Sequence, residues 1–509
     1  MDESVFATLR RGFAGREEAR FLETPDGRSW TYGDLLARSA AYARMLVGSG
    51  LSPGDRVAVQ VEKSAENLFL YFGCLRAGGV YLPLNTAYTL SELEYFLSDA
   101  EPRIVVVAPE RVAEVKRLAP RAVVLALDAR GRGSAAEAAD AAAGPFSDIP
   151  RGADDLAAIL YTSGTTGRAK GAMLTHRNLA SNAMVLKDYW RITAEDVLLH
   201  ALPVYHVHGL FTATNTLVAA GGAIIFLPRF DLDLVFRFLP RATVMMGVPT
   251  YYTRMLADPR LGRETVAKVR LFISGSAPLL PETHRAFLER TGHAILERYG
   301  MTETGMNASN PYEGERRAGT VGFPLPGVEI RITDPETGRV LPAGEIGMIE
   351  VRGPNVFKGY WKNPEKTKAE FREDGFFVTG DLGRFDEKGY LSIVGRAKDL
   401  VISGGLNVYP KEVEEAIDAL PGVVESAVVG VPHPDFGEAV IACVVRAKGA
   451  AIDEAAIQKA LADKLAAFKR PKRVIFLDEL PRNAMGKVQK NLLRERFADL
   501  FAAAPAALR

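Results

Sequence analysis

One loop of the chain combines glycine, hydroxyl and lysine residues, Thr162-Ser163-Gly164-Thr165-Thr166-Gly167-Arg168-Ala169-Lys170-Gly171, and it directly follows the apolar run Leu156-Ala157-Ala158-Ile159-Leu160-Tyr161. The glycines let the backbone approach a ligand closely, the hydroxyl groups add hydrogen-bond donors, and Lys170 supplies a positive charge. The apolar run predicts a buried strand, and a strand that leads into such a loop is typical of a phosphate site. The sequence therefore predicts a polyphosphate ligand.

This loop differs from the P-loop of the Walker type. That motif requires the order G-x-x-x-x-G-K-[ST], whereas the order here is Gly164-x-x-Gly167-x-x-Lys170-Gly171. We therefore expect a nucleotide site on a fold other than that of the P-loop NTPases.

Helix and strand patterns alternate on both sides of the loop. Thr31 with Asp34, and Thr89 with Glu92, have the spacing of a capping box, which marks the start of a helix. Apolar runs predict strands at residues 55–61, 104–107, 223–227, 243–248 and 270–274. This alternation predicts an α/β fold of βα-layered, parallel sheets, with a cleft at the carboxyl ends of the strands.

The pattern changes toward the C-terminus. Short strands with Gly/Pro turns follow Gly319 and predict a compact β module, and the residues after Asp399 predict a small α+β unit with a helix over 453–468. We expect a large N-terminal AMP-binding domain, residues 1–396, which includes the β module, and a small, mobile C-terminal domain, residues 397–509.

Composition narrows the class of protein. The chain has 509 residues, 48% hydrophobic content and a net charge of +1, so no strong field favours nucleic acid or an anionic membrane as partner. Cys74 and Cys443 are the only cysteines, too few for a disulfide framework. No apolar stretch of about 18 residues occurs. We expect a cytoplasmic protein with no nucleic-acid partner and no membrane association.

Six segments, taken together and in this order, resemble the adenylate-forming acyl-CoA synthetases of the ANL superfamily, which are related to firefly luciferase. They are residues 161–171, 203–209, 299–303, 379–381, 395–399 and 481–487. The resemblance implies a reaction in two steps. A carboxylate first attacks the α-phosphorus of ATP and releases pyrophosphate, and the thiol of CoA then attacks the acyl-adenylate and releases AMP.

The resemblance also implies roles for residues of the first step. Lys487 bridges the carboxylate and the α-phosphate, Glu303 binds Mg²⁺, and Thr302 donates to the α-phosphate. The ring of Tyr299 stacks on adenine, and Asp381 with Arg396 holds the ribose. The implied nucleotide-binding residues are Thr162, Ser163, Gly164, Thr165, Thr166, Gly167, Lys170, Tyr299, Gly300, Met301, Thr302, Asp381 and Arg396.

For the second step, Lys398 occupies the position of the family's hinge, about which the small domain swings Lys487 out of the site. The same motion brings in Ser403, Gly404 and Gly405, where a pair of glycines lets the pantetheine arm of CoA approach the backbone. A plain β-turn is the alternative interpretation of this pair. His206, in the Pro-x-x-His-x-x-Gly element, is implied to act at the passage for acyl group or pantetheine.

The acid is predicted from Arg254, in a segment that resembles the wall of the acyl pocket. A guanidinium there suits a second carboxylate, which indicates a short dicarboxylic acid, with Ser274, Gly275, Ser276 and His208 completing the site. These segments are similar to those of malonyl-CoA synthetases, so we expect malonate, with methylmalonate tolerated. The alternative is that Arg254 is a solvated residue on the outside of a helix.

Two other functions fit parts of the pattern. One is a synthetase for another short acid or an aryl acid, and the other is a non-catalytic nucleotide-binding protein. If the chain is a malonate ligase, its co-substrates are ATP and CoA and its cofactor is Mg²⁺. The resemblance further implies a lysine acyltransferase and deacylase acting on Lys487, because acylation would remove its charge.

Overall fold

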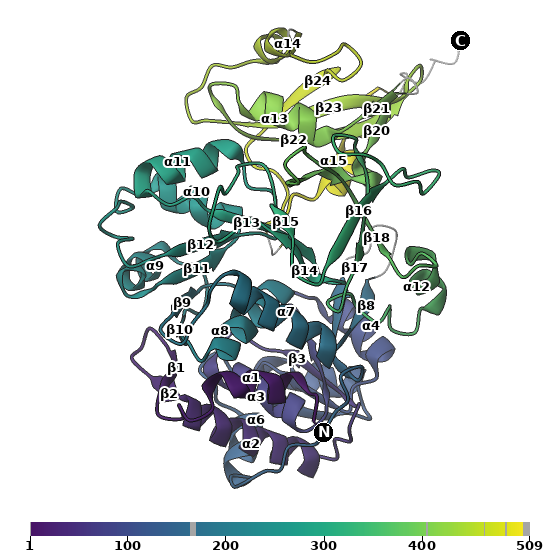
Figure 1. Ribbon diagram of the computed structural model, residues 1–509. Helices are drawn as coiled ribbons and strands as arrows, with labels where there is room; N and C mark the ends of the chain where they lie inside the picture. The colour runs from purple at the N-terminus through teal and green to yellow at the C-terminus, as the bar shows by residue number, and fades with distance from the viewer. Residues whose placement is uncertain (1, 163–168, 404–405, 463, 484–485, 502–509) are drawn as a thin grey trace. The chain divides into compact units, whose positions relative to one another are not determined.

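The computed structural model describes residues 2–162, 169–403, 406–462, 464–483 and 486–501 (Figure 1). The chain divides into two compact units. The first comprises Met1–Leu279, Thr283–Ile330 and Val351–Phe377, and the second comprises Leu280–Glu282, Arg331–Glu350 and Val378–Arg509. The boundary expected between residues 396 and 397 lies within the second unit, and its position stays a prediction.

The first unit contains a six-stranded sheet in the order β6-β5-β3-β4-β7-β8. The strands from β6 to β7 run parallel, as the alternating pattern predicts, and β8 is antiparallel to β7. The bounds are β3 (Arg56–Gln60), β4 (Val80–Pro83), β5 (Ile104–Val107), β6 (Val123–Ala126), β7 (Leu156–Thr162) and β8 (Lys170–Thr175). The predicted polyphosphate loop thus connects β7 to the edge strand β8.

A nine-stranded sheet in the order β15-β14-β13-β12-β11-β9-β10-β1-β2 forms the rest of this unit's framework. Its central strands are parallel, and the hairpin β13–β14 continues it on one side. The bounds are β1 (Arg20–Glu23), β2 (Ser29–Thr31), β9 (Val197–His200), β10 (Ala223–Phe226), β11 (Val244–Gly247), β12 (Leu271–Ser274), β13 (Leu296–Met301), β14 (Gly305–Ser309) and β15 (Phe323–Pro324).

Helices cover both sheets. Their bounds are α1 (Val5–Arg10), α2 (Tyr32–Gly48), α3 (Ala65–Arg76), α4 (Leu90–Ala100), α5 (Val112–Leu118), α6 (Ser134–Ala141), α7 (His176–Tyr189), α8 (Asn215–Ala220), α9 (Leu232–Phe238), α10 (Pro249–Ala257), α11 (Pro281–Thr291) and α12 (Pro364–Glu370). The capping boxes predicted at Thr31 and Thr89 are confirmed at the starts of α2 and α4. Each threonine hydroxyl accepts from the backbone N–H of the residue three positions on, Asp34 or Glu92, and the carboxylate of that residue accepts from the threonine's own N–H.

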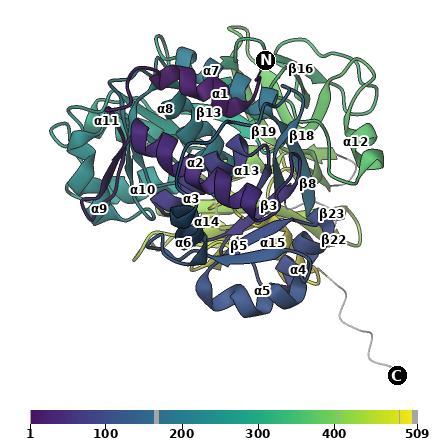
Figure 2. The same cartoon turned by 90° about the horizontal axis from the view of Figure 1, so that it is seen from below.

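The layers follow from the two-residue period of the strands. Met246 and Ile273 belong to a central core that both sheets share with α2, α3, α7 and α8. Their neighbours Met245 and Phe272 point to the other face and pack with α9, α10 and α11 (Figure 1). Helices α4 and α5 cover the outer face of the six-stranded sheet (Figure 2). The predicted βα layering is therefore confirmed.

The second unit contains the β module and the C-terminal α+β part. The β module is a sheet in the order β16-β17-β18-β19, and the C-terminal sheet has the order β21-β20-β23-β22 with β24 beside β23. The bounds are β16 (Glu329–Thr333), β17 (Gly347–Arg352), β18 (Phe377–Phe385), β19 (Leu391–Arg396), β20 (Val401–Ser403), β21 (Leu406–Val408), β22 (Val423–His433), β23 (Gly437–Arg446), β24 (Arg473–Leu477), α13 (Pro410–Asp418), α14 (Glu454–Ala462) and α15 (Lys490–Arg496).

In the second unit, the end of α14 differs from the sequence-based prediction, and the pairing of β20 with β21 adds to it. The helix expected over 453–468 ends at Ala462, because Leu465 and Phe468 reach the core from turns rather than from a continued helix. The strands β20 and β21 pair antiparallel, with Val401 opposite Val408 and Ser403 opposite Leu406. In the part of the chain that the structure describes, no helix combines the length and the apolar character that crossing a bilayer demands.

His176, the first residue of α7, joins this helix to α1. Its Nδ1 accepts a hydrogen bond from the backbone N–H of Val5 at 3.2 Å, and its Nε2 is buried without a partner among the described residues. Burial, with a smaller contribution from the charge of Arg151, lowers the pKa of His176 to about 4. The folded protein therefore keeps this imidazole neutral.

The low pKa of His176 predicts a loss of stability in acid. Between pH 6.5 and about 4 the unfolded chain binds a proton here that the folded chain does not, so the free energy of unfolding falls with pH, by about 3 kcal/mol in total. In His176→Asn the amide oxygen replaces Nδ1 as acceptor but cannot titrate. Urea unfolding measures the fall in the free energy of unfolding between pH 7 and pH 5. This fall should be smaller by about 2 kcal/mol in His176→Asn than in the wild type, and an equal fall in both proteins would contradict the assignment.

Candidate active site

The strand β8 pairs with a segment that lies far away in sequence. The N–H of Met173 donates to the carbonyl of Gly359 at 2.9 Å, and the N–H of Trp361 donates to the carbonyl of Gly171 at 2.8 Å. This pairing brings Tyr360 to Lys170, whose Nζ lies 5.3 Å from the centre of the phenol ring. A lysine of the predicted phosphate loop is thus placed by backbone hydrogen bonds on both sides.

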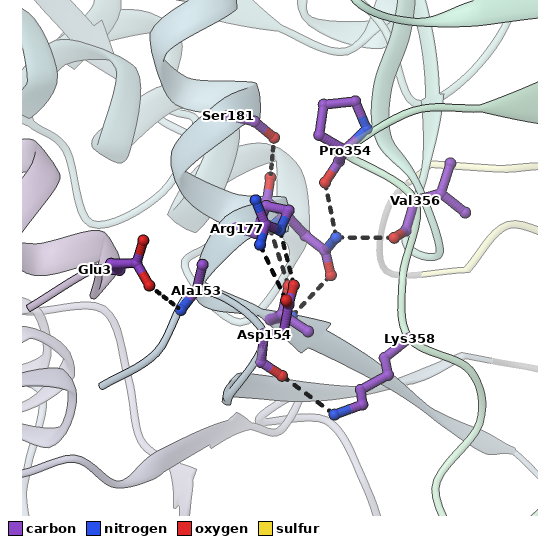
Figure 3. Close-up of polar contacts among 10 residues, drawn as sticks. Glu3, Ala153, Asp154, Arg177, Ser181, Pro354, Val356 and Lys358 are labelled. Carbon is purple, nitrogen blue, oxygen red and sulfur yellow. Dashed lines mark hydrogen bonds and ion pairs between the residues drawn. The ribbon is translucent and has the colours of Figure 1, made fainter. Parts of the chain in front are cut away.

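The start of α7 holds the same segment in place (Figure 3). The side-chain amide of Asn178 donates to the carbonyls of Pro354 and Val356, both at 2.8 Å. Lys358 donates to the carbonyl of Asp154 at 3.2 Å, and the carboxylate of Asp154 binds Arg177 through two nitrogens (Figure 3). These contacts fix the backbone that leads to Tyr360.

Tyr360 connects two carboxylates. Its hydroxyl lies 3.3 Å from Oε1 of Glu303, which is 7% exposed, and donates to Oε2 of Glu370 at 2.7 Å. Lys366 forms an ion pair with Glu370 at 2.6 Å, and burial together with the charge of Lys366 lowers the pKa of Lys170. The site therefore combines two lysines, suited to phosphate, with a fixed carboxylate oxygen, suited to a hard cation.

The turn of the β13–β14 hairpin carries Thr302 and Glu303. Tyr299 is buried at 8% exposure in β13, and Met301 ends that strand. At Gly300 a Cβ atom would lie 2.1 Å from the carbonyl oxygen of Gly305 across the hairpin, so only glycine fits there. The hairpin thus gathers four of the predicted nucleotide-binding residues and the predicted Mg²⁺ ligand, Glu303, near its tip.

Arg298, the residue before Tyr299 in β13, is a buried cation. Arg298 is 3% exposed, and its Nε and Nη2 have no hydrogen-bond partner among the residues that the structure describes. The guanidinium lies against Gly275, where a Cβ atom would be 2.3 Å from Cζ. Burial lowers the pKa of Arg298 to about 9, so the group is charged at neutral pH.

His208 and Ser276 lie beside this guanidinium. Nδ1 of His208 is 3.1 Å from Oγ of Ser276, while its Nε2 is buried and unpartnered in the described part of the chain. Burial, followed by the charge of Arg298, lowers the pKa of His208 well below its usual value. Ser276 has φ = 71°, a left-handed conformation that strains a residue with a side chain.

Ser274, at the end of β12, adds a buried hydroxyl that likewise has no partner among the described residues. Buried polar atoms are almost always hydrogen-bonded in native proteins, so several unused groups in one place point to a polar ligand. We call Ser274, Gly275, Ser276, His208 and Arg298 the Arg298 cluster. Its charge and its free donors suit an anion.

The other two residues predicted to meet the substrate lie differently. Arg254 is exposed on α10, where it borders a surface depression with Phe230, Asp231 and Arg260. Its side chain is solvent-exposed, as in the alternative interpretation from the sequence, and its contact with the substrate stays a prediction. His206 is half-buried, and its Nδ1 accepts from the N–H of His208 at 3.3 Å.

The second unit carries the remaining predicted residues. Asp381 in β18 is 5% exposed and pairs with Arg396 of β19, whose Nε is 3.2 Å from its carboxylate. Lys398 is exposed in a short helical turn that ends at Asp399.

The C-terminal residues predicted for catalysis and for CoA also lie in this unit. Lys487 is half-buried, and its N–H donates to Oδ1 of Asn483 at 3.0 Å. Ser403 is buried at the end of β20. Ser163, Gly164, Thr165, Thr166, Gly167, Gly404 and Gly405 lie outside the described residues, whereas Thr162 ends β7.

Sequence reasoning missed several residues of these sites. No role was assigned to Arg298, Tyr360 or Lys366, although Arg298 gave one signal, a charge between the apolar run Ala294–Leu296 and the aromatic Tyr299. The sequence carries no such signal for Tyr360 or Lys366, because Tyr360 is brought to the site by pairing with β8 and Lys366 by its ion pair with Glu370.

Two family models match most of the chain. The model of the AMP-binding enzyme family matches residues 9–361, and that of the AMP-binding enzyme C-terminal domain matches residues 412–487. The chain therefore belongs to the AMP-binding enzyme family. It is an AMP-forming acid–CoA ligase, with ATP and CoA as substrates.

Individual relatives lie close to this chain. It is similar to the crystal structure of ATP-bound MatB from Rhodopseudomonas palustris, with 61% identity, a TM-score of 0.97 and coverage of 98% of this chain and 100% of that one. A feruloyl-CoA synthase of Amycolatopsis sp. is 38% identical, covering 92% of this chain and 94% of its own. A malonate–CoA ligase of Arabidopsis thaliana is 35% identical, with 92% and 85% covered.

Proposed function

We propose that this ligase activates malonate and forms malonyl-AMP and then malonyl-CoA. The observation that carries the proposal is the buried, charged Arg298, whose Nε and Nη2 lack a partner among the described residues. A fork of two N–H groups matches a carboxylate in geometry and charge. One carboxylate of malonate would bind there while the other meets ATP, and the relative named a malonate–CoA ligase supports this choice.

Binding at the Arg298 cluster would also explain how other acids are rejected. A monocarboxylate such as acetate leaves the guanidinium without a counter-ion, and a site built for a polar group rejects an analogue that lacks it by roughly 10⁴-fold. Methylmalonate adds only one methyl group, which changes binding by about 1–3 kcal/mol, so we expect it to be used. His208 and Ser276 would add hydrogen bonds to the clamped carboxylate.

For the first step, we assign Lys487 to the space between carboxylate and α-phosphate, and Thr302 to the α-phosphate. The loop from Thr162 to Lys170 would hold the phosphates that leave, while Asp381 and Arg396 would hold the ribose. His206 would line the passage of the acyl group.

The proposed cofactor is Mg²⁺. Its ligand would be Glu303, whose carboxylate already lies within reach of the hydroxyl of Tyr360, and magnesium in nucleotide sites commonly uses one or two carboxylates plus phosphate oxygens. When bound, the ion would neutralise charge on the phosphates. The residues present therefore fit this cation.

For the second step, we propose Lys398 as the hinge and Ser403, Gly404 and Gly405 as the contact of the pantetheine arm. Acylation of Lys487 by a lysine acyltransferase, reversed by a deacylase, would remove the charge that the first step needs and thus regulate the enzyme.

A substrate panel tests the proposal. Purified protein with ATP, Mg²⁺ and CoA should release AMP fastest with malonate, more slowly with methylmalonate, and at least about 10³-fold more slowly with acetate. Ferulate is the control for the alternative, since a relative of similar identity is named a feruloyl-CoA synthase. Faster AMP release with ferulate or acetate than with malonate would overturn the proposal.

A further inference from the structure

Another buried cation of the first unit is Lys63. Lys63 follows β3 and is only 9% exposed, and none of the residues described in the structure offers it a carboxylate. Its Nζ lies 4.2 Å from the centre of the Phe226 ring. Burial of an amine without a counter-ion costs free energy and lowers the pKa of Lys63, so its retention calls for a specific reason.

Lys63 binds a single residue through two hydrogen bonds. Its Nζ donates to Nδ1 of His200 at 2.9 Å and to the carbonyl of the same residue at 2.8 Å. The carbonyl of Gly209, 2.9 Å from Nε2, can only accept, so the neutral imidazole carries its proton on Nε2 and Nδ1 accepts from Lys63. Burial, then the charge of Lys63, keeps the pKa of His200 well below its usual value, which is consistent with a neutral ring. Lys63 therefore stabilises the tautomer of His200 in which Nε2 carries the proton.

The Nε2–H of His200 donates to the carbonyl of Gly209 at 2.9 Å. The hydroxyl of Thr214 donates to the same carbonyl, also at 2.9 Å. Gly209 is tightly enclosed, since a Cβ atom there would lie 2.0 Å from the carbonyl oxygen of Pro203. Two buried side chains thus hold one carbonyl in a backbone that has little room to shift.

Gly209 belongs to a π-helix, His208–Thr214, in which the ordinary helical hydrogen bonds are replaced by wider ones. The first residue of this π-helix is His208, which contacts Ser276 and faces Arg298. The chain of hydrogen bonds Lys63–His200–Gly209 therefore ends next to the Arg298 cluster. A displacement of Gly209 would move His208 directly.

We propose that Lys63 and His200 are positioning residues for the acid: they fix the carbonyl of Gly209, and thereby the π-helix that presents His208 beside Arg298. The proposal rests on the proposed acid site at the Arg298 cluster. Neither residue touches the substrate; Lys63 acts by stabilising this tautomer of His200, and His200 acts through the backbone. The ATP site has no part in this chain of contacts, so its affinity should not depend on it.

The test compares KM values for acid and for ATP in three variants. Lys63→Met keeps the aliphatic stem but removes both donors, and it should raise KM for the acid about tenfold, the effect of one lost hydrogen bond, with KM for ATP changed less than about twofold. In His200→Gln the side-chain amide can still donate to the carbonyl of Gly209, and it has no tautomers to be selected. This variant should therefore raise KM for the acid less than Lys63→Met does. Adding Lys63→Met to His200→Gln should then change KM for the acid little.

A matched control is Tyr32→Phe, which removes another buried hydrogen bond to a backbone carbonyl, that of Gly222 at 2.6 Å. It should leave both KM values unchanged. Hydrogen–deuterium exchange should increase over residues 206–214 in Lys63→Met and stay unchanged in Tyr32→Phe.

Equal changes in both KM values, or no change in either, would overturn the proposal. If Lys63→Met does not fold, Thr214→Val provides the test, because it removes the other donor to the carbonyl of Gly209. An unchanged KM for the acid in Thr214→Val would also overturn the proposal. The assays use whichever acid the wild-type enzyme turns over best. A failure of malonate as substrate is therefore seen in the wild type, whereas a failure of positioning is seen only in the variants.

Discussion

Lys487→Ala is expected to lower the rate of acyl-AMP formation by about 10²- to 10³-fold and to leave the reaction of CoA with supplied malonyl-AMP within a few-fold of wild type. The reason is electrostatic: two like charges about 4 Å apart repel by roughly 4 kcal/mol at an effective dielectric of 20, and Lys487 is the proposed cation between them. Pyrophosphate release measures the first step, and AMP release from supplied malonyl-AMP with CoA measures the second.

The matched control for this variant is Lys490→Ala. Lys490 is three residues away in the same unit, and its ammonium binds Glu414 at 2.6 Å. Both half-reactions should stay within a few-fold of wild type in this control. Equal losses in both half-reactions of Lys487→Ala would contradict the assignment. Acylated Lys487, which lacks the charge, should behave like the alanine variant.

Arg298→Met is expected to lower kcat/KM for malonate by about 10³- to 10⁴-fold and to change acetate turnover far less, which reverses or abolishes the preference between them. The variant removes the fork that would bind the second carboxylate. It should also unfold at the same or a higher temperature, because a buried guanidinium, whose Nε and Nη2 have no partner among the described residues, gives way to an apolar side chain of similar length. AMP release with both acids and a thermal melt measure these effects.

Arg254 provides the comparison within the same experiment. Arg254→Ala should have a smaller effect on malonate than Arg298→Met if the buried guanidinium is the anchor, since Arg254 is exposed. Arg260→Ala, in the same surface depression but paired with Asp258 at 2.7 Å, is the control for surface charge. A large loss in Arg254→Ala with normal malonate use in Arg298→Met would move the acid site from β13 to α10.

Local sequence was sufficient for much of the fold. The capping boxes at Thr31 and Thr89 fix where α2 and α4 begin, because a cap needs only residues three positions apart. The continuous apolar run of β5 predicts a strand buried on both faces, as parallel strands between layers are. By contrast, the end of α14 could not be predicted, since it depends on how Leu465 and Phe468 reach the core.

The π-helix at residues 208–214 could not be predicted either. After His208 its residues are apolar or small and fit an ordinary buried helix, whereas the groups that bond the carbonyl of Gly209 are His200, from a different element, and Thr214. The buried position of Lys63 is a similar case, because lysines are mostly exposed and nothing near it in sequence indicates its partner.

The sequence by itself determined the class of protein, through its resemblance to the adenylate-forming synthetases, and it predicted the tip of the β13–β14 hairpin as part of the site. Both rest on segments in which the residues of a motif, such as Thr302 and Glu303, are neighbours along the chain and can be recognised without the fold. Only the tertiary structure decided which arginine is buried beside Ser276 and His208, and which residues hold Gly209. Those contacts join β12, β13 and the π-helix, and burial is set by what the folded chain packs around a charge rather than by its neighbours in sequence.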